Sequence, residues 1–134
     1  MTEQQKIEYS QLEVGYEFPP ASYNLGSADV SAYLKATGET DRLFQNTGIV
    51  PPTAIAAWSL IALLDYVDMP SGTIHLAQEL ESVGIAKESD TITCHARVSR
   101  KQERSGLRLL DIEFKVQDQN GDLVVAGKSS FNFP

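Results

Sequence analysis

Hydrophobic residues follow two different spacings along the chain, and the change comes near residue 73. Within residues 27–38 the apolar positions lie three and four apart, which predicts an amphipathic helix from Ser27 to a stop at Gly38. Its apolar stripe consists of Val30, Tyr33 and Leu34. A second helix is predicted from near Pro52 to near Asp68, because proline suits a first turn and apolar residues cover several faces. Such a helix is expected to be buried.

From residue 73 onward apolar and polar residues alternate, which predicts strands over 73–83, 91–100, 107–117 and 123–133, after a short one at 21–25. In the segment 73–83 one face should hold Ile74, Leu76, Gln78 and Leu80, and the other His75, Ala77, Glu79 and Glu81. Short connections, such as the hairpin signal Asn120-Gly121, favour an antiparallel meander. The sequence therefore predicts an α+β fold of hot-dog type, in which a curved antiparallel sheet wraps around one long central helix.

Composition narrows the possible functions. The 134 residues, 42% hydrophobic and 22% charged, are typical of one soluble domain over 1–134, with 1–20 as a lead-in arm. A net charge of −7 argues against a nucleic-acid partner, and the apolar stretch 54–64 is too short to cross a bilayer. The polar N-terminus does not resemble a signal peptide, and a single cysteine fits a reducing compartment. We therefore expect a cytoplasmic protein with no membrane partner.

Four phrases carry a family resemblance. "YLKATGETDRLF" and "GIVPPTAIAAWSL" are followed by "HLAQELESVGIAKESDTIT" and "QDQNGDLVVAGKSSF". In this order they resemble the MaoC-like hydratase/dehydratase family. They match, in turn, its helix ending in a Gly-Asp-x-Asn-Pro-Leu-His loop, the start of its central helix, its strand–turn–strand phrase and its final hairpin. The resemblance runs from Leu12 to Pro134 and is closest to the N-terminal, non-catalytic-subunit branch.

The resemblance implies reversible addition of water to a 2-enoyl thioester carried on coenzyme A (CoA) or acyl carrier protein. The sequence contains no phosphate-binding loop, metal-ligand spacing or nucleophile motif, so we expect no other cofactor and no metal. In active members the loop Asp and His reach one water, and the His holds or releases a proton. A backbone N–H at the start of the central helix stabilises the enolate oxygen.

This sequence departs from that motif. Glu39 stands at the Asp position, Asp41 at the Asn, Arg42 at the Pro and Phe44 at the His. Phenylalanine cannot transfer a proton. The helix glycine that offers its N–H aligns with Pro52, which has none.

Three functions remain open. The first is an accessory subunit that binds an acyl thioester and forms a double hot dog, as a homodimer or as a heterodimer with a second hot-dog chain, through an edge strand. The second is an active hydratase with a relocated dyad of Glu39 and His75. The third is a hot-dog thioesterase that uses a carboxylate near the far end of the central helix, Asp65 or Asp68.

Several side chains have two interpretations. Glu39 and Asp41 are either a surviving general base or a solvated loop after a helix stop. The candidate substrate contacts are Phe44, Thr53, Ala54, Trp58 and Gln78. Phe44 and Trp58 would also suit core packing, and Gln78 would also suit a hydrogen bond within the protein. Cys94 lies in an alternating segment, which favours a core residue over a nucleophile.

Overall fold

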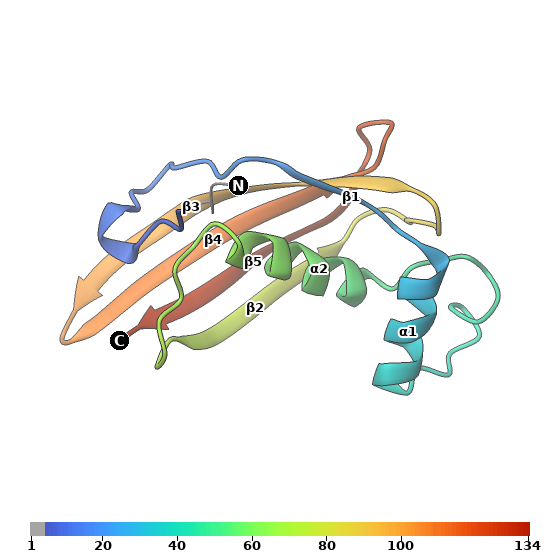
Figure 1. Cartoon of the computed structure of the whole chain (residues 1–134), viewed down its shortest axis with the longest axis horizontal. Coiled ribbons are helices and arrows are strands. Elements are labelled where there is room, and N and C mark those ends of the chain that lie inside the picture. The colour runs from blue at the N-terminus through green and yellow to red at the C-terminus, as the bar shows by residue number, and fades with distance from the viewer. Residues whose placement is uncertain (1–4) are drawn as a thin grey trace.

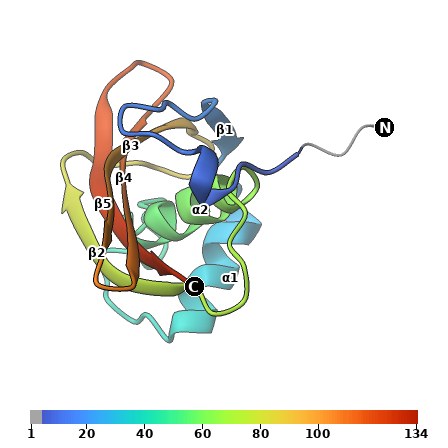
Figure 2. The same cartoon turned by 90° about the vertical axis from the view of Figure 1, so that its left-hand side faces the viewer.

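The computed structural model describes residues 5–134, so residues 1–4, the start of the expected arm, lie outside the described range. The elements in chain order are η1 (Tyr9–Gln11), β1 (Ala21–Asn24), α1 (Ser27–Thr37), α2 (Pro52–Leu64), β2 (Ile74–Ser82), β3 (Thr91–Arg104), β4 (Leu107–Gln117) and β5 (Leu123–Phe133). The strands form one antiparallel sheet that curves around α2, as Figures 1 and 2 show. The predicted sheet wrapped around a central helix is confirmed.

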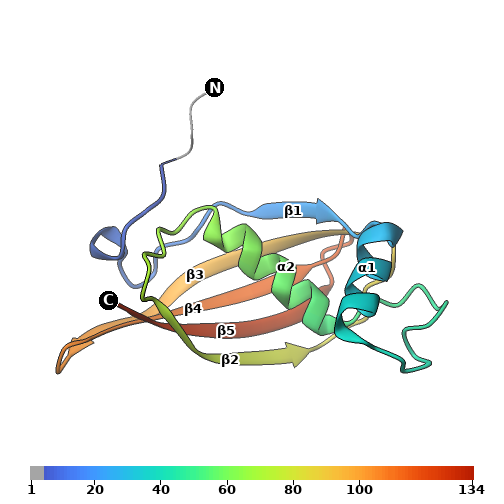
Figure 3. The same ribbon diagram turned by 60° about the horizontal axis from the view of Figure 1, so that its bottom comes forward.

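The strand order is β1-β3-β4-β5-β2, so the predicted four-strand meander is wrong for β2. The connection between β2 and β3 is longer than a tight turn. Val83 and Gly84 donate their N–H groups to the Val124 carbonyl at 2.8 and 3.0 Å, and the Ala86 carbonyl accepts from Val50 N–H at 2.9 Å. These bonds carry the chain across the end of the sheet. As a result β2 pairs with β5 at the edge opposite β1 (Figure 3).

The observed ends of the two α-helices agree in part with those predicted from the sequence. Gly38 ends α1 in the left-handed conformation, with φ 68°, as predicted, while the N-cap is Gly26 rather than Ser27. Helix α2 begins at Pro52 as predicted and ends at Leu64, short of Asp68. It stops there because the backbone turns to pair with the N-terminal arm through Ile7. No helix within residues 5–134 has the length and hydropathy to cross a membrane.

The N-terminal arm completes the core. Tyr9, Leu12 and Phe18 are each 4% exposed or less and join the hydrophobic cluster at the C-terminal end of α2. The Tyr9 ring lies 4.8 Å from the Lys101 ammonium and 4.5 Å from the Arg108 guanidinium, measured to the ring centroid. The arm is therefore a packed part of the domain.

Strand β2 departs most from its predicted pattern. All nine of its residues are exposed, so its expected apolar face is not buried by this chain. A bulge lies between His75 and Ala77, and it moves His75 onto the α2 side of the sheet, the same face as Gln78. The predicted grouping of His75 with Glu79 is therefore wrong, because strict alternation assumes an unbroken ladder.

Candidate functional site

The loop after α1 is shaped by its own two carboxylates. After Gly38 turns the backbone, Glu39 N–H donates to the Leu34 carbonyl at 3.0 Å. Glu39 Oε1 accepts from Asp41 N–H at 2.9 Å, and Asp41 Oδ1 accepts from Leu43 N–H at 2.9 Å. Short polar side chains commonly satisfy backbone donors in turns this way. The bonds support the interpretation of both residues as loop-forming.

Glu39 and Phe44 nevertheless line the same hollow, the loop hollow. It has a volume of about 520 Å³ and is lined by Ser27, Ser31, Leu34, Lys35, Glu39, Phe44, Gln45, Asn46, Gly48 and Glu88. Asp41 is absent from this lining, so only Glu39 of the two carboxylates reaches it. The lining carries hydroxyl, amide, ammonium and carboxylate groups and no imidazole, the side chain whose ordinary pKa lies nearest to neutral pH.

The sequence did not single out Ser31 and Lys35, although both line this hollow. They lie four residues apart on α1, so they share a helix face. This four-residue spacing of two polar residues was the feature of the sequence that could have identified them. The helix was predicted instead from the apolar stripe on its neighbouring face.

The start of α2 offers one free backbone donor. Pro51 and Pro52 have no N–H, and Ala54 N–H donates to the Pro51 carbonyl at 3.0 Å. Thr53 N–H makes no hydrogen bond within the described chain. The Thr53 hydroxyl accepts from Tyr33 at 2.9 Å, and Ala54 is fully buried in the core. If a backbone oxyanion donor is present here, it is Thr53 N–H.

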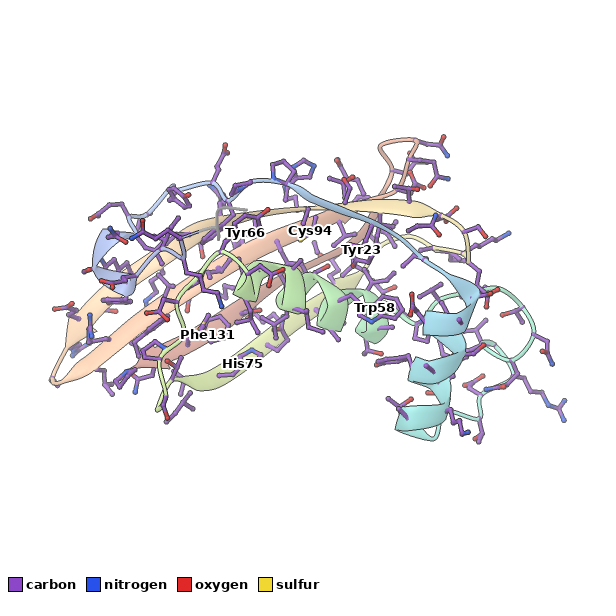
Figure 4. The ribbon with its side chains drawn as sticks, viewed as in Figure 1. Tyr23, Trp58, Tyr66, His75, Cys94 and Phe131 are labelled. Atoms are coloured by element: carbon purple, nitrogen blue, oxygen red, sulfur yellow. The ribbon has the colours of Figure 1, made fainter. Side chains whose placement is uncertain are left out.

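His75 and Gln78 lie elsewhere, on the edge strand. The His75 ring stacks on the Phe131 ring, with the ring centroids 4.9 Å apart. Figure 4 shows both residues away from α1 and the loop that follows it. Gln78 Oε1 accepts from the Ser129 hydroxyl at 2.6 Å. The hydrogen-bonding interpretation of Gln78 is thereby supported. Within one chain Glu39 and His75 do not form a dyad, because β2 starts at the end of the sheet away from α1.

Trp58 occupies a second hollow, on the β1 side of α2. This hollow measures about 380 Å³, and its lining includes Tyr23, Trp58, Ile61 and Asp65. Tyr23 meets Trp58 edge-on at 6.3 Å, and its hydroxyl donates to the Ile55 carbonyl at 3.2 Å. Burial raises the pKa of Tyr23 to about 12, partly opposed by its hydrogen bond with Ser59. Trp58 and Phe44 therefore line separate hollows.

The remaining candidates do not line the hollow that Glu39 and Phe44 share. Cys94 is 6% exposed, and burial raises the pKa of its thiol, which disfavours the thiolate that a nucleophile requires. Asp65 is the C-cap of α2 and is exposed, as is Asp68. His95, the second of the two histidines in the sequence, is exposed on β3, opposite Lys115.

Comparisons with known proteins give the family from a sequence model and the fold from solved structures. The family model described as "FAS1-like, dehydratase domain region" matches residues 13–126. The R-hydratase PhaJ1 from Pseudomonas aeruginosa superposes with a TM-score of 0.81 at 20% identity, covering 96% of this chain and 86% of that one. A MaoC-like dehydratase from Rhodospirillum rubrum gives 0.75 at 14% identity, covering 92% and 94%. A chain of the ChsH1–ChsH2 complex from Mycobacterium tuberculosis gives 0.75 at 11% identity, covering 91% and 98%. No curated protein sequence matches.

Proposed function

The chain belongs to the FAS1-like dehydratase-region family and has the MaoC-like hot-dog fold, and we propose that it is the non-catalytic, acyl-thioester-binding half of a double hot dog. In this proposal a second hot-dog chain supplies the acid and base. The substrate is a 2-enoyl or 3-hydroxyacyl group carried on CoA or acyl carrier protein.

The observation that carries this proposal is the loop hollow itself. Phe44 stands where the family motif has its proton-transferring His, and no imidazole lines the hollow. The Glu39 carboxylate, which would have to activate water, accepts the Asp41 N–H instead. Hydration of a 2-enoyl thioester needs a proton at C2 and an activated water at C3, so this chain alone lacks a complete acid–base pair.

The exposed edge supports the need for a second chain. Strand β2 pairs with β5 along one side only, and it exposes Ile74 (53%), Leu76 (51%) and Leu80 (36%). An unpaired strand edge beside exposed apolar side chains is a surface suited to pairing with another chain. Two solved neighbours, ChsH1–ChsH2 and HadBC, are complexes of two different chains.

The test measures binding and turnover separately. Crotonyl-CoA and a longer 2-enoyl-CoA are titrated while the fluorescence of Trp58, the single tryptophan, is followed. Hydration is assayed by loss of the enoyl absorbance, and thioester cleavage by release of free CoA. We expect saturable binding with no hydration and no cleavage by the isolated chain. Hydration by the isolated chain that disappears in Glu39→Gln would refute the non-catalytic assignment.

One observation keeps the active hydratase as a second candidate. If two copies paired antiparallel through β2, the start of β2 in one copy would lie beside the end of β2 in the other. The loop that follows α1 lies near the end of β2 in its own chain, because Ile49, just after that loop, bridges Lys87. His75 of one copy would then approach the loop of its partner. This alternative requires a homodimer. Loss of hydration in both Glu39→Gln and His75→Gln would support it.

A further inference from the structure

We propose that the β2 edge selects a partner of different sequence, one whose edge strand carries Lys or Arg at two alternating positions on the convex face. The inference rests on the proposed function, in which β2 is the docking edge. It adds that this chain disfavours pairing with its own copy. The outward carboxylates of Glu79 and Glu81 determine this selection.

These two carboxylates lie on the convex side of the sheet. Gln78 faces α2, where it bonds Ser129, so its neighbour Glu79 faces the opposite way. Glu79 is 3.6 Å from the Lys128 ammonium and remains 71% exposed. Glu81 pairs in register with Ala126 and makes no ion pair within the described residues. The outer rim of the edge is therefore acidic, while apolar side chains extend along the same strand.

Self-pairing would bring these carboxylates together. In a two-fold antiparallel pair that continues the sheet, directly opposite residues have their side chains on the same face. The two-fold axis therefore passes beside one residue, which lies opposite its own copy, and residues equally far before and after it lie opposite each other. The regular part of β2, Ala77–Ser82, is centred between residues 79 and 80. A two-fold at residue 79 sets Glu79 against Glu79 of the second copy. A two-fold at residue 80 sets Glu79 against Glu81 twice, and one at residue 81 sets Glu81 against Glu81. Like charges directly opposite destabilise strand pairing.

The charge of the whole chain acts in the same direction. Two copies would each carry a net charge of −7, which opposes their approach at low ionic strength. Lys128 already contacts Glu79 of its own chain, so it offers little compensation to a second copy. An edge strand with cations at the matching positions would instead gain cross-strand ion pairs and a faster encounter.

The test compares three forms by analytical ultracentrifugation. Glu79→Gln/Glu81→Gln removes the repulsion without placing a new cation beside Lys128. Glu79→Lys/Glu81→Lys is mixed in equal amounts with wild type. We expect the neutral variant to self-associate roughly tenfold more tightly than wild type, and the mixture to associate roughly tenfold more tightly than either component alone. Wild-type self-association should increase with salt, because salt screens the repulsion.

A matched control changes the same charge elsewhere. Glu13→Lys/Glu17→Lys changes two exposed carboxylates of the arm, beside β3 on the β1 side of the sheet, and should give no preferential mixed association. Circular dichroism establishes that each variant is folded. A wild-type dimer as tight as that of the neutral variant at low salt would overturn the inference, and so would an absence of association in every form. Either result leaves the turnover assay of the isolated chain to decide the proposed function separately.

Discussion

Replacing Tyr23 with Phe should reverse the order of stability between wild type and variant as the pH rises. At neutral pH the change removes the hydrogen bond from the Tyr23 hydroxyl to the Ile55 carbonyl, at 3.2 Å. Ser59 keeps its own 2.8 Å bond to that carbonyl, so no buried group loses its only partner. The expected cost is therefore about 1 kcal/mol in the free energy of unfolding.

Alkaline pH should remove this advantage. Burial raises the pKa of Tyr23 from 10.0 to about 12, so the folded chain favours the protonated phenol. A group whose folded pKa is raised contributes its full stability below the unfolded pKa and loses it as the pH rises through the folded pKa. Two pKa units correspond to about 2.7 kcal/mol, reduced to about 2 kcal/mol because the ring is partly exposed. At about pH 12 the Phe variant should then be the more stable by about 1 kcal/mol.

Urea unfolding followed by Trp58 fluorescence from neutral pH to about pH 12 measures both free energies. Tyr33→Phe is the matched control, because Tyr33 contacts the same indole at 6.0 Å while its hydroxyl bonds Thr53 near the surface. That variant retains Tyr23 and should follow wild type. If the free energies of unfolding of wild type and Tyr23→Phe fell in parallel across the alkaline range, burial of this phenol would not govern the loss of stability at high pH.

Three further changes test the packing. Gly127→Ala would place a Cβ against the Glu79 carbonyl and 2.6 Å from the Phe114 ring, so we expect a loss of about 3 kcal/mol in the free energy of unfolding and faster hydrogen exchange in β2. Gly26→Ala is the control, because its backbone φ is −68° and a Cβ there meets only the Asp29 side chain, at 3.4 Å; it should leave β2 exchange unchanged. Leu12→Ala removes a fully buried arm side chain and should cost about 2–5 kcal/mol by thermal unfolding. Cys94 should react with iodoacetamide much more slowly in the folded chain than in urea, because the thiol is buried and its pKa is raised; equal rates would contradict its place in the core.

The elements that the sequence predicted well are those fixed by local chemistry. Gly38 ends α1 because few other residues adopt a left-handed backbone without strain, and Pro52 opens α2 because the first turn needs no N–H from it. Alternation located β3, β4 and β5, since each buries a continuous face against α2. These signals act over a few residues and can be detected in a single sequence.

The position of β2 depends on distant contacts and could not be predicted in the same way. A meander follows when connections are tight, and the segment 83–90 contains enough turn residues to suggest one. Its backbone instead bonds Val124 and Val50, which are distant in sequence. Periodicity has no means of identifying those partners. The loop hollow was missed in part for the same reason, because Glu88 reaches it from this connection.

The bulge in β2 has the largest functional consequence of these long-range features. One unpaired residue places His75 on the α2 side, where its ring stacks on Phe131 and remains exposed at the edge. On that face the imidazole could meet a second chain, whereas on the convex face it would meet the Glu79 and Glu81 rim. Whether His75 ever approaches a Glu39 carboxylate then depends on which chain pairs with β2. If those two carboxylates exclude a second copy, His75 faces the site of a different protein, and the acid–base chemistry of the assembly must come from that partner. The charge on the rim of one edge strand thus decides between the non-catalytic half and the hydratase with a relocated dyad.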